Sequence, residues 1–480
     1  MTLCPRLWVR VALCAVLVTT GTMAGQPAGA APPPVSASIP DDCPADAPLL
    51  RYVVLFAPGT GQQVATREVT GACGSVTAYY REIGVGVATG PVPAFDRRIG
   101  SGRAYSAAAE ASAGDRPPPS GQAALDSPAT GDVATADRSG EQWNMAMIGA
   151  VRSNALEPGS DDVVVGVLDS GIDPSHPELV RALDPQRSAG CLSGAPDPSP
   201  RAWAPTGSTH GTHVAGTIAA ADDGRGITGV APGVRIASVK VVDDEGYIYP
   251  EYAVCGFMWA ARQGMDVTNN SYFVDPWLLT CADEPGQQVA HEAVRRAVAH
   301  ATASGVLPVA ATGNEALDLA APAIDLRSPD NVAHPRPRAV DDDCEVLPAE
   351  LPGVVAVSAV GSQRTKSGYS SYGRDVVDLT APGGDTSQPT SVSSSGCVLS
   401  TTPGGYGYAC GTSMAAPHAA GVAALLASRR PAAGPARLAG LLAEQADPLG
   451  CTSAAARCDG DVDHRYYGQG LVGALTAVTS

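Results

Sequence analysis

The chain has 480 residues, of which 44% are hydrophobic, so it is long and apolar enough for two or three globular domains with buried cores. This composition excludes a disordered or fibrous chain. Because 48 acidic side chains outnumber 31 basic ones, the net charge of −17 opposes binding to nucleic acid or to anionic lipid and suits solubility outside the cell.

The first 30 residues have the pattern of a secretory signal peptide. Arg6 and Arg10 precede the apolar run 11–18, and an Ala-Gly-Ala cleavage site follows at 28–30. The apolar run is far shorter than the roughly 20 residues that a membrane-spanning helix needs. We therefore expect residues 1–30 to be removed, and the mature protein to be secreted to the extracellular space without a membrane anchor.

The cysteines predict disulfide bonds. The sequence has 12 cysteines, and the two in the signal peptide leave an even number in an oxidising compartment. The two that lie before residue 101 and the eight that follow can each pair within their own region. Short spacings favour Cys397 with Cys410 and Cys451 with Cys458. The remaining pairings stay open, since eight cysteines allow about 105 connectivities.

Residues 40–100 are expected to form a small α+β domain. Strand-like runs at 51–58, 75–80 and 83–90 alternate with turn-rich breaks. From 101 to 140 the chain consists mainly of Ala, Ser, Gly, Pro and Asp with hardly any large apolar residues. This composition predicts a flexible linker in which proteolytic processing takes place.

Between residues 141 and 480, apolar β-branched runs alternate with helical stretches. Such alternation is typical of an α/β fold with a doubly wound, mainly parallel sheet, here of about six or seven strands. The predicted strands are 163–168, 234–242, 266–272, 306–312, 353–360 and 376–380. The predicted helices include 210–221, 250–264, 288–305 and 413–430.

Three polar residues stand where these strands end or helices begin, which is where reactive groups gather in open α/β sheets. Asp169 follows the apolar strand, His210 opens a helix of small residues, and Ser413 opens a long apolar helix. A serine hydroxyl needs an imidazole to accept its proton, and the imidazole needs a buried carboxylate to fix its tautomer. Unpaired N–H groups at a helix start also stabilise the charge that develops on an attacked carbonyl. The three residues together predict a hydrolase with Ser413 as nucleophile, His210 as base and Asp169 behind the histidine.

The segments around these residues, DSG, HGTHVAG and GTSMAAPH, resemble the three motifs of the subtilase, or subtilisin-like, serine protease family and occur in the same order. The resemblance extends from about Asp161 to the end of the chain. It implies that residues 141–480 are the catalytic domain of a secreted endopeptidase that cleaves protein or peptide substrates through an acyl-enzyme. It also implies that residues 40–100 are a propeptide that assists folding and inhibits the enzyme. We expect a monomer that needs no cofactor for catalysis.

The resemblance gives further positions an expected role. Asn314 matches the side chain that donates to the oxyanion. Where subtilases usually have Ser-Leu-Gly-Gly, this chain has Ser271 to Val274 with the sequence Ser-Tyr-Phe-Val, so we expect Phe273 to narrow the pocket for the residue before the scissile bond. An extended peptide is expected to lie between two protein strands. The expected substrate-binding residues are Ser271, Tyr272 and Phe273 on one wall, Gly246, Tyr247 and Ile248 on the opposite wall, and Ala311, Thr312 and Gly313 beside Asn314.

Two acidic residues raise the question of a structural calcium ion. Glu178 and Asp223 match positions that bind a stabilising ion in some subtilases, and hard oxygen ligands suit calcium. The alternative is that both are solvated surface carboxylates. Loss of thermal stability with a chelator would distinguish the two.

Other classes of protein fit the motifs less well. An aspartic protease would need a second Asp-Ser-Gly motif. An α/β-hydrolase would have the order Ser, Asp, His and the motif G-x-S-x-G. A catalytically silent protein that holds peptides in the same groove remains the alternative, and reaction of Ser413 with a serine-directed phosphonyl fluoride would distinguish it from an enzyme.

Overall fold

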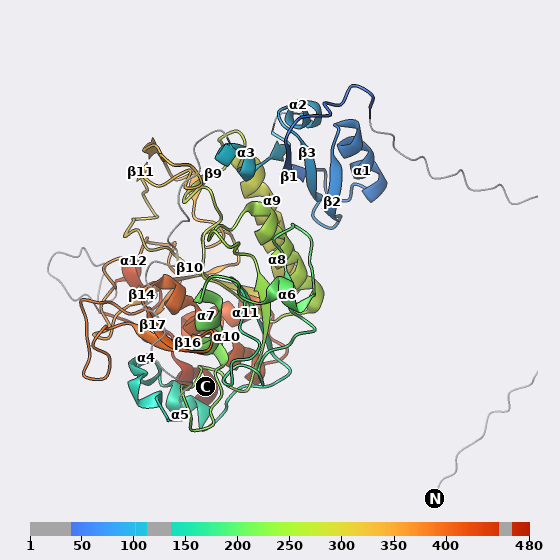
Figure 1. Ribbon diagram of the computed structural model, residues 1–480. Coiled ribbons are helices and arrows are strands. Elements are labelled where there is room, and N and C mark those ends of the chain that lie inside the picture. Colours follow the sequence, from blue (N-terminus) through green and yellow to red (C-terminus); the bar gives the residue numbers. More distant parts are fainter. Residues whose placement is uncertain (1–39, 101, 113–135, 451–462) are drawn as a thin grey trace, which may run out of the picture. The chain divides into compact units, whose positions relative to one another are not determined.

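The computed structural model describes residues 40–100, 102–112, 136–450 and 463–480 (Figure 1). The predicted signal peptide at 1–30 lies outside these residues, and so do Cys451 and Cys458. None of the helices within the described ranges combines the length and hydropathy that crossing a bilayer requires.

The N-terminal region is an α+β unit with its own small core. Its four strands form an antiparallel sheet in the order β2-β3-β1-β4, and α1 connects β1 to β2. The aromatic rings of Tyr52 and Phe95 pack 4.7 Å apart in this core. The elements are β1 Leu49–Leu55, α1 Gln62–Gly71, β2 Ser75–Tyr80, β3 Val85–Pro91, α2 Ala94–Ile99 and β4 Ala104–Tyr105.

Ordered elements continue past Gly100 into the segment that its composition marks as a linker. β4 pairs with β1, and α3 Ala107–Ser112 follows it. Tyr105 and Ala107 are buried; Trp277 donates a hydrogen bond to the Tyr105 hydroxyl (3.1 Å), and Asn331 donates to the Ala107 carbonyl (2.9 Å). The small-residue composition did not predict this ordered structure, because the residues that contact it, Trp277 and Asn331, lie far along the chain.

The rest of the described chain is built on a seven-stranded sheet in the order β15-β14-β10-β8-β5-β7-β6. Every neighbouring pair is parallel. The strands are β5 Val164–Asp169, β6 Ala189–Gly190, β7 Arg235–Lys240, β8 Val267–Asn270, β10 Leu307–Ala311, β14 Val355–Val360 and β15 Leu379–Pro382. The six strands predicted from the sequence are thus confirmed. The seventh strand of this sheet, which the sequence did not predict, is the two-residue β6.

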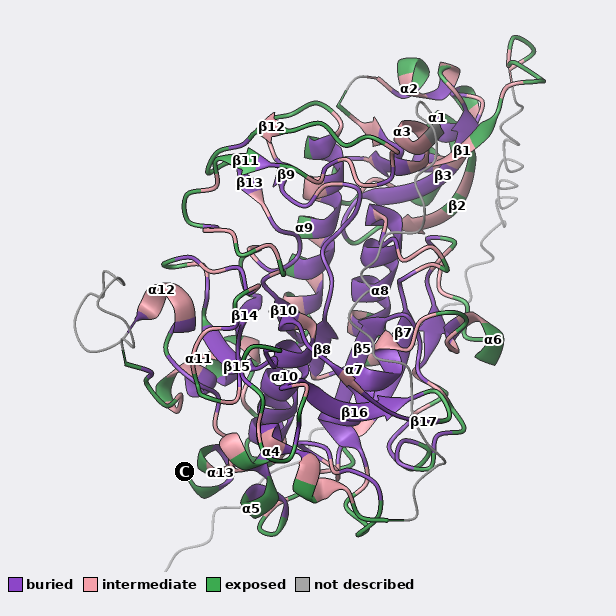
Figure 2. Cartoon of the chain, turned by 60° about the vertical axis from the view of Figure 1, so that its left-hand side comes forward, coloured by how far each residue is buried: buried purple, intermediate pink, exposed green. Residues whose placement is uncertain are grey.

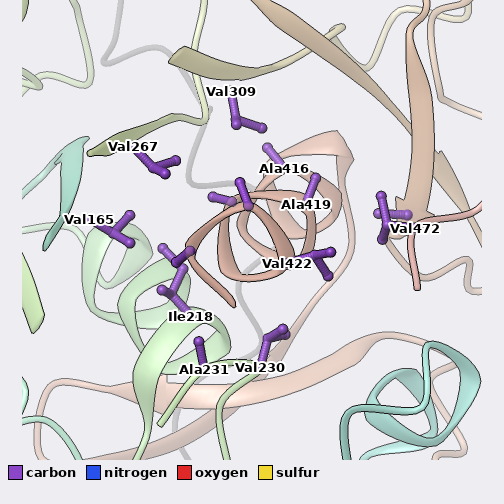
Figure 3. Packing of buried hydrophobic residues seen from close by; sticks show 14 of the residues in the cluster. Val165, Ile218, Val230, Ala231, Val267, Val309, Ala416, Ala419, Val422 and Val472 are labelled. Atoms are coloured by element: carbon purple, nitrogen blue, oxygen red, sulfur yellow. The ribbon is translucent and has the colours of Figure 1, made fainter. Parts of the chain in front are cut away.

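Helices cover both faces of the sheet, which confirms the doubly wound α/β prediction. Helices α7 and α10 lie on one side of the sheet and α8 and α9 on the other (Figure 2). Val165 and Val167 of β5 belong to the same apolar cluster as α7 and α10, whereas Val164 and Leu168 belong to the cluster of α8 and α9. Within the first layer, α10 is surrounded by apolar side chains from the sheet and from α7 (Figure 3). These helices are α7 His210–Ala219, α8 Pro250–Gln263, α9 Gln287–Ala303 and α10 Thr412–Arg429.

Shorter elements surround this sandwich. The hairpin of β16 Val398–Thr402 and β17 Gly405–Ala409 lies against α7, where a Cβ at Gly216 would come within 2.2 Å of Thr401. The other helices are η2 Ser139–Glu141, α4 Trp143–Met147, α5 Ala150–Asn154, α6 Pro200–Trp203, α11 Pro435–Glu444, α12 His464–Tyr467 and α13 Ala474–Thr479. The two-residue strands β9 Thr280–Cys281 and β13 Cys344–Glu345 pair with each other, as do β11 Ile324–Asp325 and β12 Arg338–Ala339.

Disulfide bonds link cysteines within each region. The predicted bond between Cys397 and Cys410 is confirmed, and Cys43 pairs with Cys73 in the N-terminal unit. The structure also shows two pairings that the spacing left open, because the paired cysteines are 64 and 63 residues apart in the sequence. These are Cys191 with Cys255 and Cys281 with Cys344.

Candidate active site

Asp169 and His210 meet at the edge of the sheet where β5 ends and α7 begins. Nδ1 of His210 lies 2.8 Å from Oδ1 and 3.0 Å from Oδ2 of Asp169, whose side chain is buried. The Ser170 amide donates to Oδ1 (2.7 Å) and so holds the carboxylate. A Cβ at Gly211 would lie 2.5 Å from the Gly171 carbonyl, so glycine lets the helix start this close to the strand end. Because an ionised carboxylate only accepts hydrogen bonds, Nδ1 carries the hydrogen and Nε2 is the basic nitrogen of the neutral ring.

Ser413 is the second residue of α10, and the end of β8 fixes its backbone. The Ser413 hydroxyl donates to the Ser271 carbonyl (3.2 Å), while the Ser271 hydroxyl donates to the Ser413 carbonyl (2.9 Å). Asn269 in turn donates to the Ser271 hydroxyl (2.9 Å). The first-turn N–H groups of a helix have no partner within it, and they carry the positive end of the helix dipole. Ser413 therefore lies in a field that favours negative charge.

The residue before the serine orients Asn314. Oδ1 of Asn314 accepts hydrogen bonds from both the amide and the hydroxyl of Thr412, each at 2.9 Å. Since both donors use the oxygen, the Nδ2 group is directed to the other side of the amide, beside Gly411. Asn314 is exposed and lines the same pocket as Ser413.

A pocket of about 140 Å³ opens beside Ser413. Of the substrate-binding residues expected from the sequence, the structure brings Ser271, Tyr272, Phe273, Ala311 and Gly313 together on its lining, with Asn314. Thr312 does not line it, because its side chain is fully buried and donates to the carbonyls of Val357 and Ser371. The lining also contains Glu315, Arg327, Val346 and Thr412, which sequence reasoning missed.

These omissions have different origins. Glu315 and Thr412 directly adjoin predicted site residues, so proximity in sequence was a usable signal. Arg327 and Val346 come from the long stretch 316–354, which follows Asn314 and carries no recognised motif, and only the path of that stretch brings them to the pocket.

The opposite wall, expected at Gly246 to Ile248, does not line this pocket. The Ile248 amide donates to Oδ2 of Asp275 (2.5 Å), and the Asp275 amide donates to the Ile248 carbonyl (2.9 Å). Tyr247 and Ile248 are both buried. A peptide that pairs with Ile248 must therefore displace Asp275. Burial, together with the charge of neighbouring Asp330, raises the pKa of Asp275 well above its ordinary value.

Two further histidines near the site hold structure together. Nε2 of His213 lies 3.2 Å from the carbonyls of Val398 and Gly407 in the β16–β17 hairpin. His418 is fully buried, with Nδ1 2.7 Å from the Met414 carbonyl and Nε2 2.8 Å from the Asn144 amide nitrogen. Burial lowers the pKa of His418 to about 4, so this ring is neutral.

The two residues that raised the question of calcium differ in exposure. Glu178 is buried, accepts a hydrogen bond from the Tyr406 hydroxyl (2.6 Å) at Oε1, and its Oε2 lacks a hydrogen bond of normal geometry. Asp223 is exposed. Burial raises the pKa of Glu178 to about 7, and the nearby charge of Asp223 adds to this. The buried, unsatisfied carboxylate oxygen fits a cation, although the described residues contain no cluster of three or more His, Cys, Asp or Glu ligands.

Comparison with known proteins gives consistent matches. The model of the subtilase family matches residues 160–470. The chain is 34% identical to subtilisin NAT of Bacillus subtilis subsp. natto over 317 residues, which are 66% of this chain and 65% of the relative. It is also 34% identical to a subtilisin of Bacillus pumilus, covering 66% of this chain and 90% of the relative.

Solved structures show the same architecture. A lanthipeptide protease is 26% identical and covers 72% of this chain and 98% of its own, with a TM-score of 0.56. The epidermin leader peptide processing serine protease of Staphylococcus aureus is 19% identical and covers 90% of this chain and 98% of its own, with a TM-score of 0.65. The second likeness concerns the fold alone.

Proposed function

Because the chain belongs to the subtilase family, we propose that it is a serine endopeptidase with Ser413 as nucleophile, His210 as general base and Asp169 as the carboxylate that orients the histidine. The observation that carries this proposal is the contact of His210 Nδ1 with both oxygens of buried Asp169. That contact makes Nε2 the basic nitrogen, and it stabilises the imidazolium that forms when Nε2 accepts a proton.

The proposed reaction proceeds through an acyl-enzyme. The Ser413 hydroxyl, which donates to the Ser271 carbonyl in the structure, turns to His210 and transfers its proton as Oγ attacks the substrate carbonyl carbon. The C–O bond to the enzyme forms, and the imidazolium then protonates the departing amine as the peptide C–N bond breaks. Water, deprotonated by His210, hydrolyses the ester and restores the hydroxyl. No cofactor takes part in these steps.

The oxyanion of the tetrahedral intermediate would accept hydrogen bonds from the Asn314 Nδ2 group and from the Ser413 backbone amide. Thr412 supports this role, because its two hydrogen bonds to Oδ1 hold the Asn314 amide in the required orientation before substrate arrives. A donor that is already oriented costs no reorganisation during the reaction.

We further propose that the N-terminal unit assists the folding of the catalytic domain and then inhibits its activity, until the unit is removed by cleavage within residues 101–140. Its contacts with the catalytic domain support this. Arg51 donates to the Leu192 carbonyl (2.7 Å), and Arg296 of α9 donates to the Phe56 (2.8 Å) and Ile83 (3.1 Å) carbonyls. The disulfide bonds favour an oxidising, extracellular destination. We also propose that the mature enzyme is a monomer and that its substrates are proteins or peptides.

The experiment is labelling of the secreted, processed protein with a serine-directed phosphonyl fluoride, followed by peptide mass spectrometry and an assay of protein hydrolysis. We expect stoichiometric modification of Ser413 and loss of hydrolysis. Ser413→Ala should abolish both, whereas Ser175→Ala, a change at an exposed serine, should alter neither. Correctly processed protein that neither reacts nor hydrolyses any substrate would support the catalytically silent alternative.

A further inference from the structure

An ion pair occupies the pocket beside Ser413. Under the proposed function, this pocket receives the side chain of the residue that precedes the scissile bond, because Ser413 and Asn314 both line it. Its lining contains two charged side chains, Glu315 and Arg327. Nη1 of Arg327 donates to Oε1 of Glu315 at 2.5 Å. The charge that a substrate side chain meets here is therefore the sum of a carboxylate and a guanidinium.

Glu315 is held in place from both ends. Its Oε2 accepts a hydrogen bond from the Asn314 backbone amide (2.7 Å), and its Oε1 accepts from Arg327. The Glu315 side chain is 14% exposed, so water screens its charge poorly. Without Arg327, the pocket would contain one poorly solvated negative charge, which is the usual way to bind a lysine or arginine side chain.

Arg327 is positioned by the segment that carries it rather than by a motif. Its backbone amide donates to Oδ1 of Asp325 (2.9 Å), and the fully buried Asp325 also forms an ion pair with Arg338 (2.9 Å). On the pocket side, the Arg327 guanidinium lies 5.8 Å from the ring centre of Phe273. The guanidinium is thus within cation–π range of the Phe273 ring and forms an ion pair with the Glu315 carboxylate.

From these contacts we propose that Arg327 determines the charge preference of this pocket by neutralising Glu315. With the pair intact, the pocket favours an uncharged side chain before the scissile bond. An arginine or lysine there would have to displace the guanidinium of Arg327 from Glu315 and would meet a like charge, while a glutamate would meet the Glu315 carboxylate. Specificity then comes from an element that opposes the wrong substrates, in addition to the contacts that favour the right ones.

The test uses the processed enzyme and a set of chromogenic peptides that differ only at the residue before the scissile bond, which is Leu, Arg or Glu. The wild type should prefer Leu. Arg327→Met keeps an unbranched apolar side chain and removes the guanidinium charge, so the ratio of kcat/KM for Arg over Leu should rise by about 10- to 100-fold. Arg327→Lys should keep the wild-type ratio, and the double variant Arg327→Met with Glu315→Gln should return to it.

Glu315→Gln tests the same pair from its other side and does not require the Arg327→Met protein to fold. It leaves the guanidinium without its counter-charge, so the ratio of kcat/KM for Glu over Leu should rise. If folded Arg327→Met, of which a separate sample reacts with the phosphonyl fluoride at Ser413, has an unchanged Arg to Leu ratio, the inference is overturned but the proposed function is not. A wild type that prefers Arg would also overturn the inference. A wild type that neither hydrolyses a peptide nor reacts at Ser413 would overturn both.

Discussion

Arg51 provides the sharpest test of how the N-terminal unit contacts the catalytic domain. Its guanidinium donates to the Leu192 carbonyl (2.7 Å), lies 3.9 Å from the carboxylate of Glu251, and packs 5.7 Å from the ring centre of Tyr252. A hydrogen bond to a charged group contributes about 1.5–3 kcal/mol. Removing Arg51 also leaves Glu251, which is 4% exposed, without its counter-charge. Arg51→Ala should therefore weaken the contact by about 2–3 kcal/mol, which is about 30- to 150-fold in an inhibition constant.

The assay adds purified N-terminal region, wild type or Arg51→Ala, to the processed enzyme and measures the inhibition constant from the rate of peptide hydrolysis. Arg67→Ala is the matched control, because Arg67 is an exposed arginine of α1 in the same unit. It should inhibit as the wild type does. Equal inhibition by the Arg51→Ala and wild-type regions would refute the reasoning, since it would mean that the contacts of Arg51 do not hold the two regions together.

Three further outcomes are expected. Asn314→Ala should lower kcat by about 10²- to 10³-fold, a range already measured for loss of the oxyanion asparagine in a subtilisin, with little change in KM by steady-state kinetics; an unaltered kcat would exclude the proposed role. Asp275→Asn keeps an acceptor for the Ile248 amide but removes a carboxyl group whose pKa is raised by folding. A carboxyl group with a raised pKa binds more protons in the folded state than in the unfolded state, so the folded wild type becomes less stable as pH rises. The variant lacks this group and should melt at a higher temperature than the wild type at pH 8 but not at pH 5. If Glu178 binds calcium, a chelator should lower the melting temperature of the wild type but not of Glu178→Ala. Identical wild-type melting curves with and without the chelator would rule the ion out.

The sequence by itself determined the sheet and the polar residues at its edge. Strands that are covered on both faces are mainly apolar, and for this reason β5, β10 and β14 were visible as predominantly apolar runs. Asp169, His210 and Ser413 follow from the same logic, because each stands at the end of a strand or the start of a helix. The motif around each of them is local, so it can be recognised without knowing which elements become neighbours.

The tertiary structure alone decided what lies opposite these residues. The pairing of Cys281 with Cys344, the burial of Tyr105 by Trp277, and the contact of Arg327 with Glu315 each join segments with no shared pattern in the sequence. The physical reason is that side-chain periodicity reports which face of an element is buried, but not the path of the loops between elements. The three residues of the proposed triad could therefore be predicted from residue types and spacing, whereas the charge of the pocket beside Ser413 depends on where the segment before β14 places Arg327.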